Sequence, residues 1–190
     1  NAYEQWGYSC LNRFNGMFAF AIWNNVEKTL FLARDRIGEK PLYYYQDRNR
    51  LVFAPEIKSI LTDSTIPREI NPRGLSNYFA FGHSVAPETI LKNVRKLLPG
   101  HYLIAKNGGT TIEEYWDVVS EGQKPELAMY TGKEFSEKIL DLLDDSVHRR
   151  MVADVSIGAF LSGGVDSSAI VALMKRHASF PVKTFSLGFT

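Results

Sequence analysis

The part of the sequence best suited to chemistry is a short run of glycine, serine and aspartate. It reads Ser162-Gly163-Gly164-Val165-Asp166-Ser167-Ser168 and lies between an apolar run, residues 155–161, and a helix-like segment. Two adjacent glycines let backbone N–H groups approach a bulky anion, which the N-terminus of a helix also attracts. The three serine hydroxyls could add donors, and Asp166 could hold a magnesium ion that bridges to phosphate oxygens. The run therefore predicts a site for magnesium-bound pyrophosphate.

Other glycine-rich motifs are excluded because this run lacks residues that they require. A Walker A loop needs a lysine after its last glycine, and none follows Gly164. The dinucleotide fingerprint G-x-G-x-x-G is absent, and a hydrolase nucleophile elbow would need glycine where Phe160 stands. The remaining alternative is an ordinary glycine turn followed by a serine-rich helix cap.

The elements around this run follow a β-α-β pattern. Thr131 and Glu134 form a capping box, and apolar residues at helical spacing continue to Val147. We then expect a buried strand over 155–161, a turn over 162–166, a helix over 167–176 and a strand over 182–189. Two strands joined by a helix are parallel, so this part opens an α/β domain of the doubly wound kind.

The first part of the chain has a different pattern, with short strands and no long helix between them. This spacing favours antiparallel pairing, and the apolar run 17–23 is typical of a strand buried on both faces. We expect strands over residues 17–23, 29–34, 41–45 and 51–54. A further strand should begin after Gly100 and, beyond a turn at 107–109, pair with a strand over 110–115. Short helices are expected over 55–61 and 72–81. Between Val118 and Tyr130 the periodicity disappears, so we place domains at 1–118 and 131–190 with a linker over 119–130.

With these residues in view, the run 162–168 resembles the SGGxDSS loop of the N-type ATP pyrophosphatases, which cleave ATP between its α and β phosphates. Earlier segments discriminate among members of that family. The segments 15–23, 33–44, 54–58 and 99–102 resemble, in that order, the latter half of the class II glutaminase domain of asparagine synthetases. The whole chain thus resembles the end of their glutaminase domain followed by the start of their synthetase domain.

The resemblance implies an α+β fold of the Ntn glutaminase type, with antiparallel sheets and helices, followed by the start of an α/β, parallel-sheet ATP pyrophosphatase domain. It implies that glutamine supplies ammonia to a second site, where aspartate is activated as β-aspartyl-AMP. The expected cofactors are ATP and Mg²⁺, and the expected partners are the small molecules aspartate, glutamine and ATP. By the same resemblance, the residues that bind ATP and pyrophosphate are Leu161, Ser162, Gly163, Gly164, Val165, Asp166, Ser167, Ser168 and Leu187, with Asp166 also binding the metal.

Two alternatives stay open. The same chemistry could act on a different carboxylate, because the resemblance does not reach the acceptor pocket, or the chain could belong to a non-catalytic paralogue. The family's nucleophilic N-terminal cysteine would precede Asn1, and further synthetase residues would follow Thr190. We therefore expect a piece of a longer protein that is catalytically incomplete at both sites, with Ile57 near the start of the family's ammonia passage.

Composition argues against several other classes of protein. The 22 basic and 21 acidic residues nearly balance, which disfavours a nucleic-acid partner, and the apolar runs are shorter than the roughly 20 residues of a membrane span. The single cysteine, Cys10, fits a reducing cytoplasm and a structural role, and the four histidines lack zinc-site spacing. A homo-oligomer is possible. We interpret Arg34, Asp35 and Arg36 as a salt-bridged loop rather than as catalytic charges.

Overall fold

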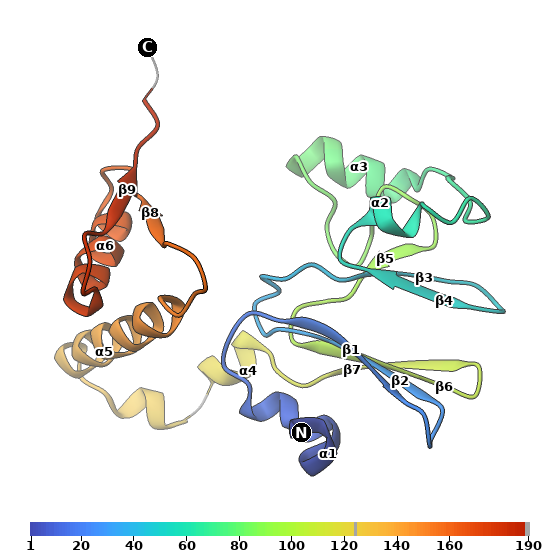
Figure 1. Cartoon of the computed structure of the whole chain (residues 1–190), viewed down its shortest axis with the longest axis horizontal. Coiled ribbons are helices and arrows are strands. Elements are labelled where there is room, and N and C mark those ends of the chain that lie inside the picture. Colours follow the sequence, from blue (N-terminus) through green and yellow to red (C-terminus); the bar gives the residue numbers. More distant parts are fainter. Residues whose placement is uncertain (124, 189–190) are drawn as a thin grey trace. The chain divides into compact units, whose positions relative to one another are not determined.

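The structure, a computed structural model, describes residues 1–123 and 125–188. The chain divides into two compact units, Asn1–Gln123 (unit 1) and Lys124–Thr190 (unit 2), which are described separately (Figure 1). The elements of unit 1 are α1 (Ala2–Trp6), the 3-10 helix η1 (Gly7–Arg13), β1 (Ala19–Asn24), β2 (Thr29–Arg34), β3 (Tyr43–Gln46), β4 (Leu51–Ala54), α2 (Ile57–Ile60), α3 (Pro72–Phe81), β5 (Val94–Lys96), β6 (His101–Lys106), β7 (Gly109–Glu114) and α4 (Val118–Gly122). Those of unit 2 are the 3-10 helix η2 (Pro125–Met129), α5 (Gly132–Arg150), β8 (Gly158–Phe160), α6 (Val165–His177) and β9 (Lys183–Phe185).

Unit 1 contains two antiparallel sheets with helices at their periphery, so the α+β class expected for this part is confirmed (Figure 1). One sheet has the strand order β1-β2-β6-β7 and the other the order β4-β3-β5. One core cluster joins the two sheets through Leu32, Leu42, Tyr44, Leu97 and Leu103. The short strand β5, which pairs with β3, was missed because three residues give too little alternation to detect.

The expectation of a strand buried on both faces was attached to the wrong segment. The segment 17–23 contributes to β1, but β1 is an edge strand of its sheet, and Trp23 remains 56% exposed. The strand buried on both faces is β2, in the interior of the same sheet. Its Phe31 packs with Cys10 of η1, whereas its Leu32 packs toward the second sheet. The fully buried Cys10 is thus a core residue, as its sequence context indicated.

Two buried charges at the end of β2 hold the loops that follow it. The carboxylate of Asp35 accepts backbone hydrogen bonds from Phe18, Glu39 and Lys40 at 3.2, 2.9 and 3.0 Å. Burial raises the pKa of Asp35, but backbone N–H donors outweigh that effect, so the net pKa is lowered. The guanidinium of Arg34 donates to the carbonyls of Lys40 and Leu97 at 2.8 and 2.6 Å. The predicted salt bridge is therefore wrong in its partners: these charges bind backbone groups.

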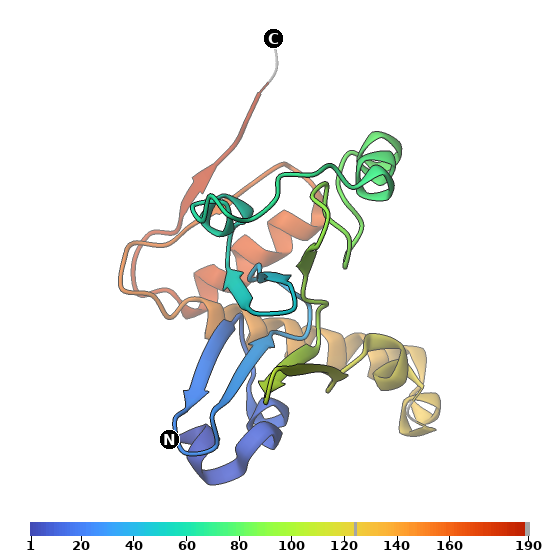
Figure 2. The same cartoon turned by 90° about the vertical axis from the view of Figure 1, so that its right-hand side faces the viewer.

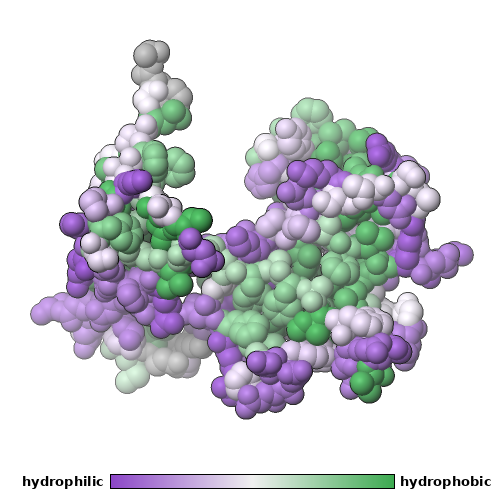
Figure 3. Space-filling view, in the orientation of Figure 1, coloured by the Kyte–Doolittle hydropathy of each residue, from purple (hydrophilic) through white to green (hydrophobic). Residues whose placement is uncertain are grey.

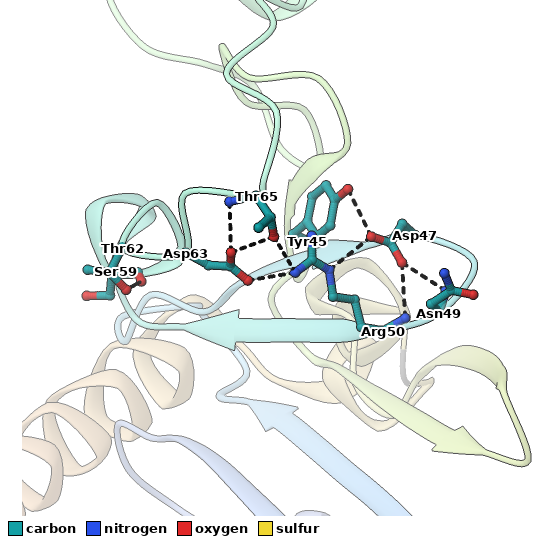
Figure 4. Close-up of polar contacts among 8 residues, drawn as sticks. All are labelled: Tyr45, Asp47, Asn49, Arg50, Ser59, Thr62, Asp63 and Thr65. Carbon is teal, nitrogen blue, oxygen red and sulfur yellow. Dashed lines mark hydrogen bonds and ion pairs between the residues drawn. The ribbon is translucent and has the colours of Figure 1, made fainter.

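A second polar cluster fixes the β3–β4 hairpin (Figure 4). The Arg50 guanidinium donates to Asp47 at 3.0 Å, to Asp63 at 2.7 Å and to Thr65 at 2.7 Å. The Tyr45 hydroxyl also donates to Asp47, at 3.2 Å. Because Asp63 and Thr65 follow α2, Arg50 connects the hairpin to the turn after that helix.

Unit 2 has the predicted β-α-β order (Figures 1 and 2). The capping box at Thr131 and Glu134 is present at the start of α5, and β8 and β9 pair in parallel. Helices α5 and α6 pack together around Val147, Leu173 and Met174. The expected parallel pairing is confirmed for these two strands.

The two strands of unit 2 are shorter and more exposed than predicted. Residues 155–161 give only the three residues of β8, and residues 182–189 only the three of β9, with residue 189 outside the described part. Phe160 and Leu187 are 85% and 82% exposed, and apolar atoms reach the surface of this unit (Figure 3). The apolar composition predicted buried strands. In unit 2, however, a helix covers one face of the two-stranded sheet, and the opposite face of the sheet remains exposed.

The predicted linker is not structureless, because residues 118–122 form α4 and residues 125–129 form η2. Asp117 begins α4 as an N-cap, accepting from the backbone N–H groups of Val119 and Ser120. Within the described residues, no helix is both long and apolar enough to cross a bilayer.

Candidate functional site

The run Ser162–Ser168 lies where β8 leads into α6, the position predicted for it. Helix α6 begins at Val165, two residues earlier than expected, with Gly164 as its N-cap. Gly163 has φ = +84°, a left-handed conformation that a residue with a Cβ atom rarely adopts. No other atom lies within 4 Å of the place where its Cβ would be. Glycine is therefore required here by backbone conformation, while the space beside it stays open.

The backbone N–H groups of this turn are free to bind an acceptor. Ser168 donates its N–H to the carbonyl of Gly164 at 3.1 Å, as the first hydrogen bond of α6. The N–H groups preceding it, from Gly163 to Ser167, have no acceptor among the residues that the structure describes. Donors of this kind at the positive end of a helix dipole favour an anion.

The serine hydroxyls are arranged differently from the simple expectation that all three face an anion. The hydroxyl of Ser167 lies 3.0 Å from that of Ser162 and 3.2 Å from the carbonyl of Gly164. The hydroxyl of Ser168 donates to the same carbonyl at 2.8 Å. The hydroxyls of Ser167 and Ser168 thus stabilise the turn by binding the carbonyl of Gly164. Among the described residues, the Ser162 hydroxyl contacts only the hydroxyl of Ser167.

Asp166 lies in the first turn of α6 and is exposed to solvent. Among the described residues, no three histidine, cysteine or acidic side chains gather as a protein-only metal cage. Magnesium commonly keeps several waters and binds through one or two carboxylates together with phosphate oxygens. A lone exposed carboxylate beside unpaired N–H groups fits that mode of binding.

The two leucines predicted to bind ATP, Leu161 and Leu187, lie at the ends of the paired strands. The N–H of Leu161 donates to the carbonyl of Phe185 at 2.8 Å, which extends the parallel pairing. Ser186 donates its hydroxyl to the carbonyl of Leu161 at 2.6 Å, a contact that sequence reasoning missed because the partner lies on the neighbouring strand. Leu187 follows directly and is largely exposed. Strand ends of this kind are where open α/β sheets bind ligands.

Comparison with protein families divides the chain at nearly the same place as its structure. Residues 1–116 match a family described as a glutamine amidotransferase domain, and residues 138–190 match one described as asparagine synthase. The predicted order of a glutaminase part followed by a synthetase part is thereby confirmed.

Individual relatives agree with the family matches. The glutamine-hydrolyzing asparagine synthetase 3 of Bacillus subtilis is 36% identical, with 100% of this chain and 31% of the relative covered. Amidase chry2 of Gibberella zeae is 35% identical over 92% of this chain and 25% of its own length. A solved glutamine phosphoribosylpyrophosphate amidotransferase from Bacillus subtilis aligns with 96% of this chain and 35% of that one, at 14% identity and a TM-score of 0.38, too low to support an argument.

The chain spans about a third of the length of the curated synthetase that it matches. The glutamine amidotransferase match alone covers well over half of the 190 residues. The chain therefore belongs to the glutamine amidotransferase domain family, and its residues 138–190 match the asparagine synthase family.

Proposed function

We propose that this chain is part of a glutamine-dependent, ATP-using amidotransferase that makes asparagine from aspartate. In this scheme glutamine supplies ammonia, ATP activates the β-carboxylate of aspartate as β-aspartyl-AMP, and pyrophosphate leaves. Ammonia then displaces AMP to give asparagine. The order of a glutaminase part and a synthetase part supports this coupling of two reactions in one protein.

The observation that carries the proposal is the turn between β8 and α6. It combines a glycine at φ = +84°, a series of unpaired backbone N–H groups and an exposed carboxylate at Asp166. The N–H groups would bind the β and γ phosphates of ATP, and Asp166 would hold Mg²⁺, which neutralises charge on the departing pyrophosphate. Leu161 and Leu187, at the strand ends, would contact the adenosine.

The acceptor substrate has a second candidate. The relative from Gibberella zeae is named an amidase and is nearly as similar to this chain as the asparagine synthetase is. The same activation of a carboxylate could therefore serve a different acid. Assaying a chain of the relatives' length with aspartate and with other carboxylic acids would distinguish the two.

Binding to the turn can be tested on the 190-residue chain itself. Titration with pyrophosphate and Mg²⁺, followed by amide NMR, should shift the signals of residues 163–167 and leave the Gly108 turn of unit 1 unchanged. Asp166→Asn should weaken binding in the presence of Mg²⁺, because it removes the metal-binding charge while keeping the side chain's shape. Asp154→Asn, a matched change at another exposed aspartate of unit 2, should leave binding unaltered. Equal effects of the two variants would contradict the role of Asp166.

Activity provides a separate test in a full-length chain carrying this sequence. Asp166→Asn should reduce aspartate-dependent pyrophosphate release by about a hundred- to a thousandfold, equivalent to roughly 3–4 kcal/mol. Glutamate release from glutamine should persist, because the glutaminase part is a different unit. Pyrophosphate release within about threefold of the unmodified protein would remove Asp166 from the site, since a lost metal ligand costs far more.

A further inference from the structure

Unit 1 contains a cavity of about 400 Å³ at the end of its four-stranded sheet opposite the β6–β7 turn. Its apolar wall includes Ile37, Leu98 and Trp116. Three charged side chains, Arg36, Glu114 and Asp117, also line it. The carboxylate of Asp117 is already engaged as the N-cap of α4. None of these residues belongs to the turn before α6, so the cavity is a separate feature of the molecule.

The cavity wall is held by the backbone contacts at the end of β2. Asp35 accepts at its carbonyl from the N–H of Gly100 at 3.0 Å, which ties the turn before β6 to the loop after β2. The carbonyl of Gly100 in turn accepts from the N–H groups of Tyr115 and Trp116 at 2.8 and 3.3 Å. The loop that carries Arg36, the turn and Trp116 are therefore connected, and the cavity is preformed.

Arg36 has fewer acceptors than its guanidinium can use. Nη2 donates to the carbonyl of Asn12 at 3.2 Å, and Cζ lies 6.0 Å from the centre of the Trp116 ring. Its Nε is buried and has no partner, the one such side-chain nitrogen or oxygen among the described residues. Only one donor of the guanidinium has an acceptor among the described residues, so an acceptor placed beside the others would be favourable. A carboxylate, which pairs with guanidinium through two oxygens, is the best-suited acceptor.

The acidic side chain of the cavity that does not cap a helix is Glu114, the last residue of β7. This side chain is 53% exposed, and its carboxylate lies 3.7 Å from Nε2 of His101. His101 points Nδ1 at the carbonyl of Pro99, at 2.7 Å. A carbonyl can only accept, so Nδ1 carries the hydrogen of this contact. At 3.7 Å, Nε2 is too far from the Glu114 carboxylate for a hydrogen bond, so Glu114 stays available to a cationic group on a ligand.

We propose that this cavity binds an apolar α-amino acid. The carboxylate would pair with the guanidinium of Arg36, the ammonium group with Glu114, and the side chain would pack against Ile37, Leu98 and Trp116. A ligand with all three features uses both charges and the apolar wall, whereas a simple carboxylate or amine uses only some of them. The site is separate from the turn before α6, because it lies in the other unit.

L-leucine is the probe for a direct test on the 190-residue chain. The chain has three tryptophans, Trp6, Trp23 and Trp116, so its ¹⁵N spectrum has three indole N–H signals. Leucine should shift the Trp116 signal in a saturable way and leave the other two unchanged. Two analogues separate the contributions: 4-methylpentanoate lacks the ammonium group, and 3-methylbutylamine lacks the carboxylate. Both should bind at least about tenfold more weakly than leucine, since each loses a charge-assisted contact.

Variants identify the two charged partners. Arg36→Gln should weaken leucine binding by about ten- to a hundredfold, and Arg48→Gln, at an exposed arginine of the β3–β4 hairpin, should not. Glu114→Gln should bring leucine down to the affinity of 4-methylpentanoate and leave that analogue unaffected. This second variant lies on an exposed side chain, so it stays informative even where Arg36→Gln disturbs folding. Equal binding of all three ligands, or a shift of all three indole signals, would overturn the proposal.

Discussion

Replacing Asp35 by asparagine should destabilise unit 1 strongly, although the two side chains have almost the same shape. Asp35 is 1% exposed. One carboxylate oxygen accepts from Glu39, and the other accepts from both Phe18 and Lys40. An asparagine can keep an oxygen at only one of these places, and its NH₂ group would then face N–H donors at the other.

The size of the effect follows from counting those donors. With the amide oxygen placed toward Glu39, the N–H groups of Phe18 and Lys40 lose their acceptor inside the protein. A buried donor left without a partner costs about 1–3 kcal/mol, so this placement would lower the free energy of unfolding of unit 1 by about 2–6 kcal/mol. The opposite placement leaves only the N–H of Glu39 without an acceptor, facing the NH₂ group, at about 1–3 kcal/mol. Because the amide adopts the less costly placement, Asp35→Asn should lower the free energy of unfolding by at least about 1 kcal/mol.

The assay can isolate unit 1 in the intact chain. All three tryptophans lie between residues 1 and 123, so tryptophan fluorescence during urea unfolding follows this unit alone. Asp117→Asn is the matched control: Asp117 also accepts two backbone N–H groups, but as the N-cap of α4, where asparagine is as favourable as aspartate. The control should change the free energy of unfolding by less than about 0.5 kcal/mol, because the cap is preserved.

The effect should also depend on pH in a defined direction. The pKa of Asp35 is lowered in the folded state, so its ionised form stabilises the fold above the unfolded pKa of about 3.9. That stability is lost as the pH falls through the folded pKa, and below it the protonated Asp35 resembles asparagine. The difference between the unmodified chain and Asp35→Asn should therefore shrink in acid. A difference below about 1 kcal/mol at neutral pH, or one that stays constant into acid, would refute the reasoning, because buried donors would then have lost little.

Two further changes test the packing of α3 and the cap of α5. Gly74→Ala places a Cβ atom 1.9 Å from the carbonyl oxygen of Thr89, so it should destabilise unit 1 by about 1–3 kcal/mol in the same fluorescence assay, whereas Gly122→Ala, with no atom within 4 Å, should be nearly neutral or stabilising. No destabilisation by Gly74→Ala would show that α3 can move away from Thr89. Thr131→Ala removes the capping box with Glu134 and should cost α5 about 0.5–2 kcal/mol, read from amide hydrogen exchange in that helix, and Thr131→Ser should restore it. Equal exchange in the alanine and serine variants would contradict a role for the cap.

Local sequence signals determined much of the element pattern. Residues 29–34 and 51–54 form strands with the predicted bounds, and residues 72–81 form the predicted helix, in which Pro72 occupies a position that needs no N–H donor. The capping box of α5 also forms at Thr131 and Glu134, as the sequence motif predicted. In each case the interactions that favour the element join residues a few positions apart, so a short stretch of sequence is enough to predict it.

The position of the candidate site was likewise determined by the sequence. A double glycine between a strand and a helix specifies a turn whose N–H groups are unpaired, whatever surrounds it. The contacts of its hydroxyls were not predictable, because Ser162 and Ser167 meet only once the turn adopts its particular conformation. Composition could not distinguish a serine that faces a ligand from one that braces the loop.

Only the tertiary structure decided which strands are buried and what the charged loop does. The segments 17–23 and 29–34 are both largely apolar, yet the first forms the edge strand β1 and the second the interior strand β2. The difference arises because β2 also pairs with β6, whose residues lie about seventy positions further along the chain. Arg34 and Asp35 were expected to pair as charges, but burial at the end of β2 made backbone groups their partners. Burial and distant pairing depend on the whole chain packing together, and no short stretch of sequence carries that information.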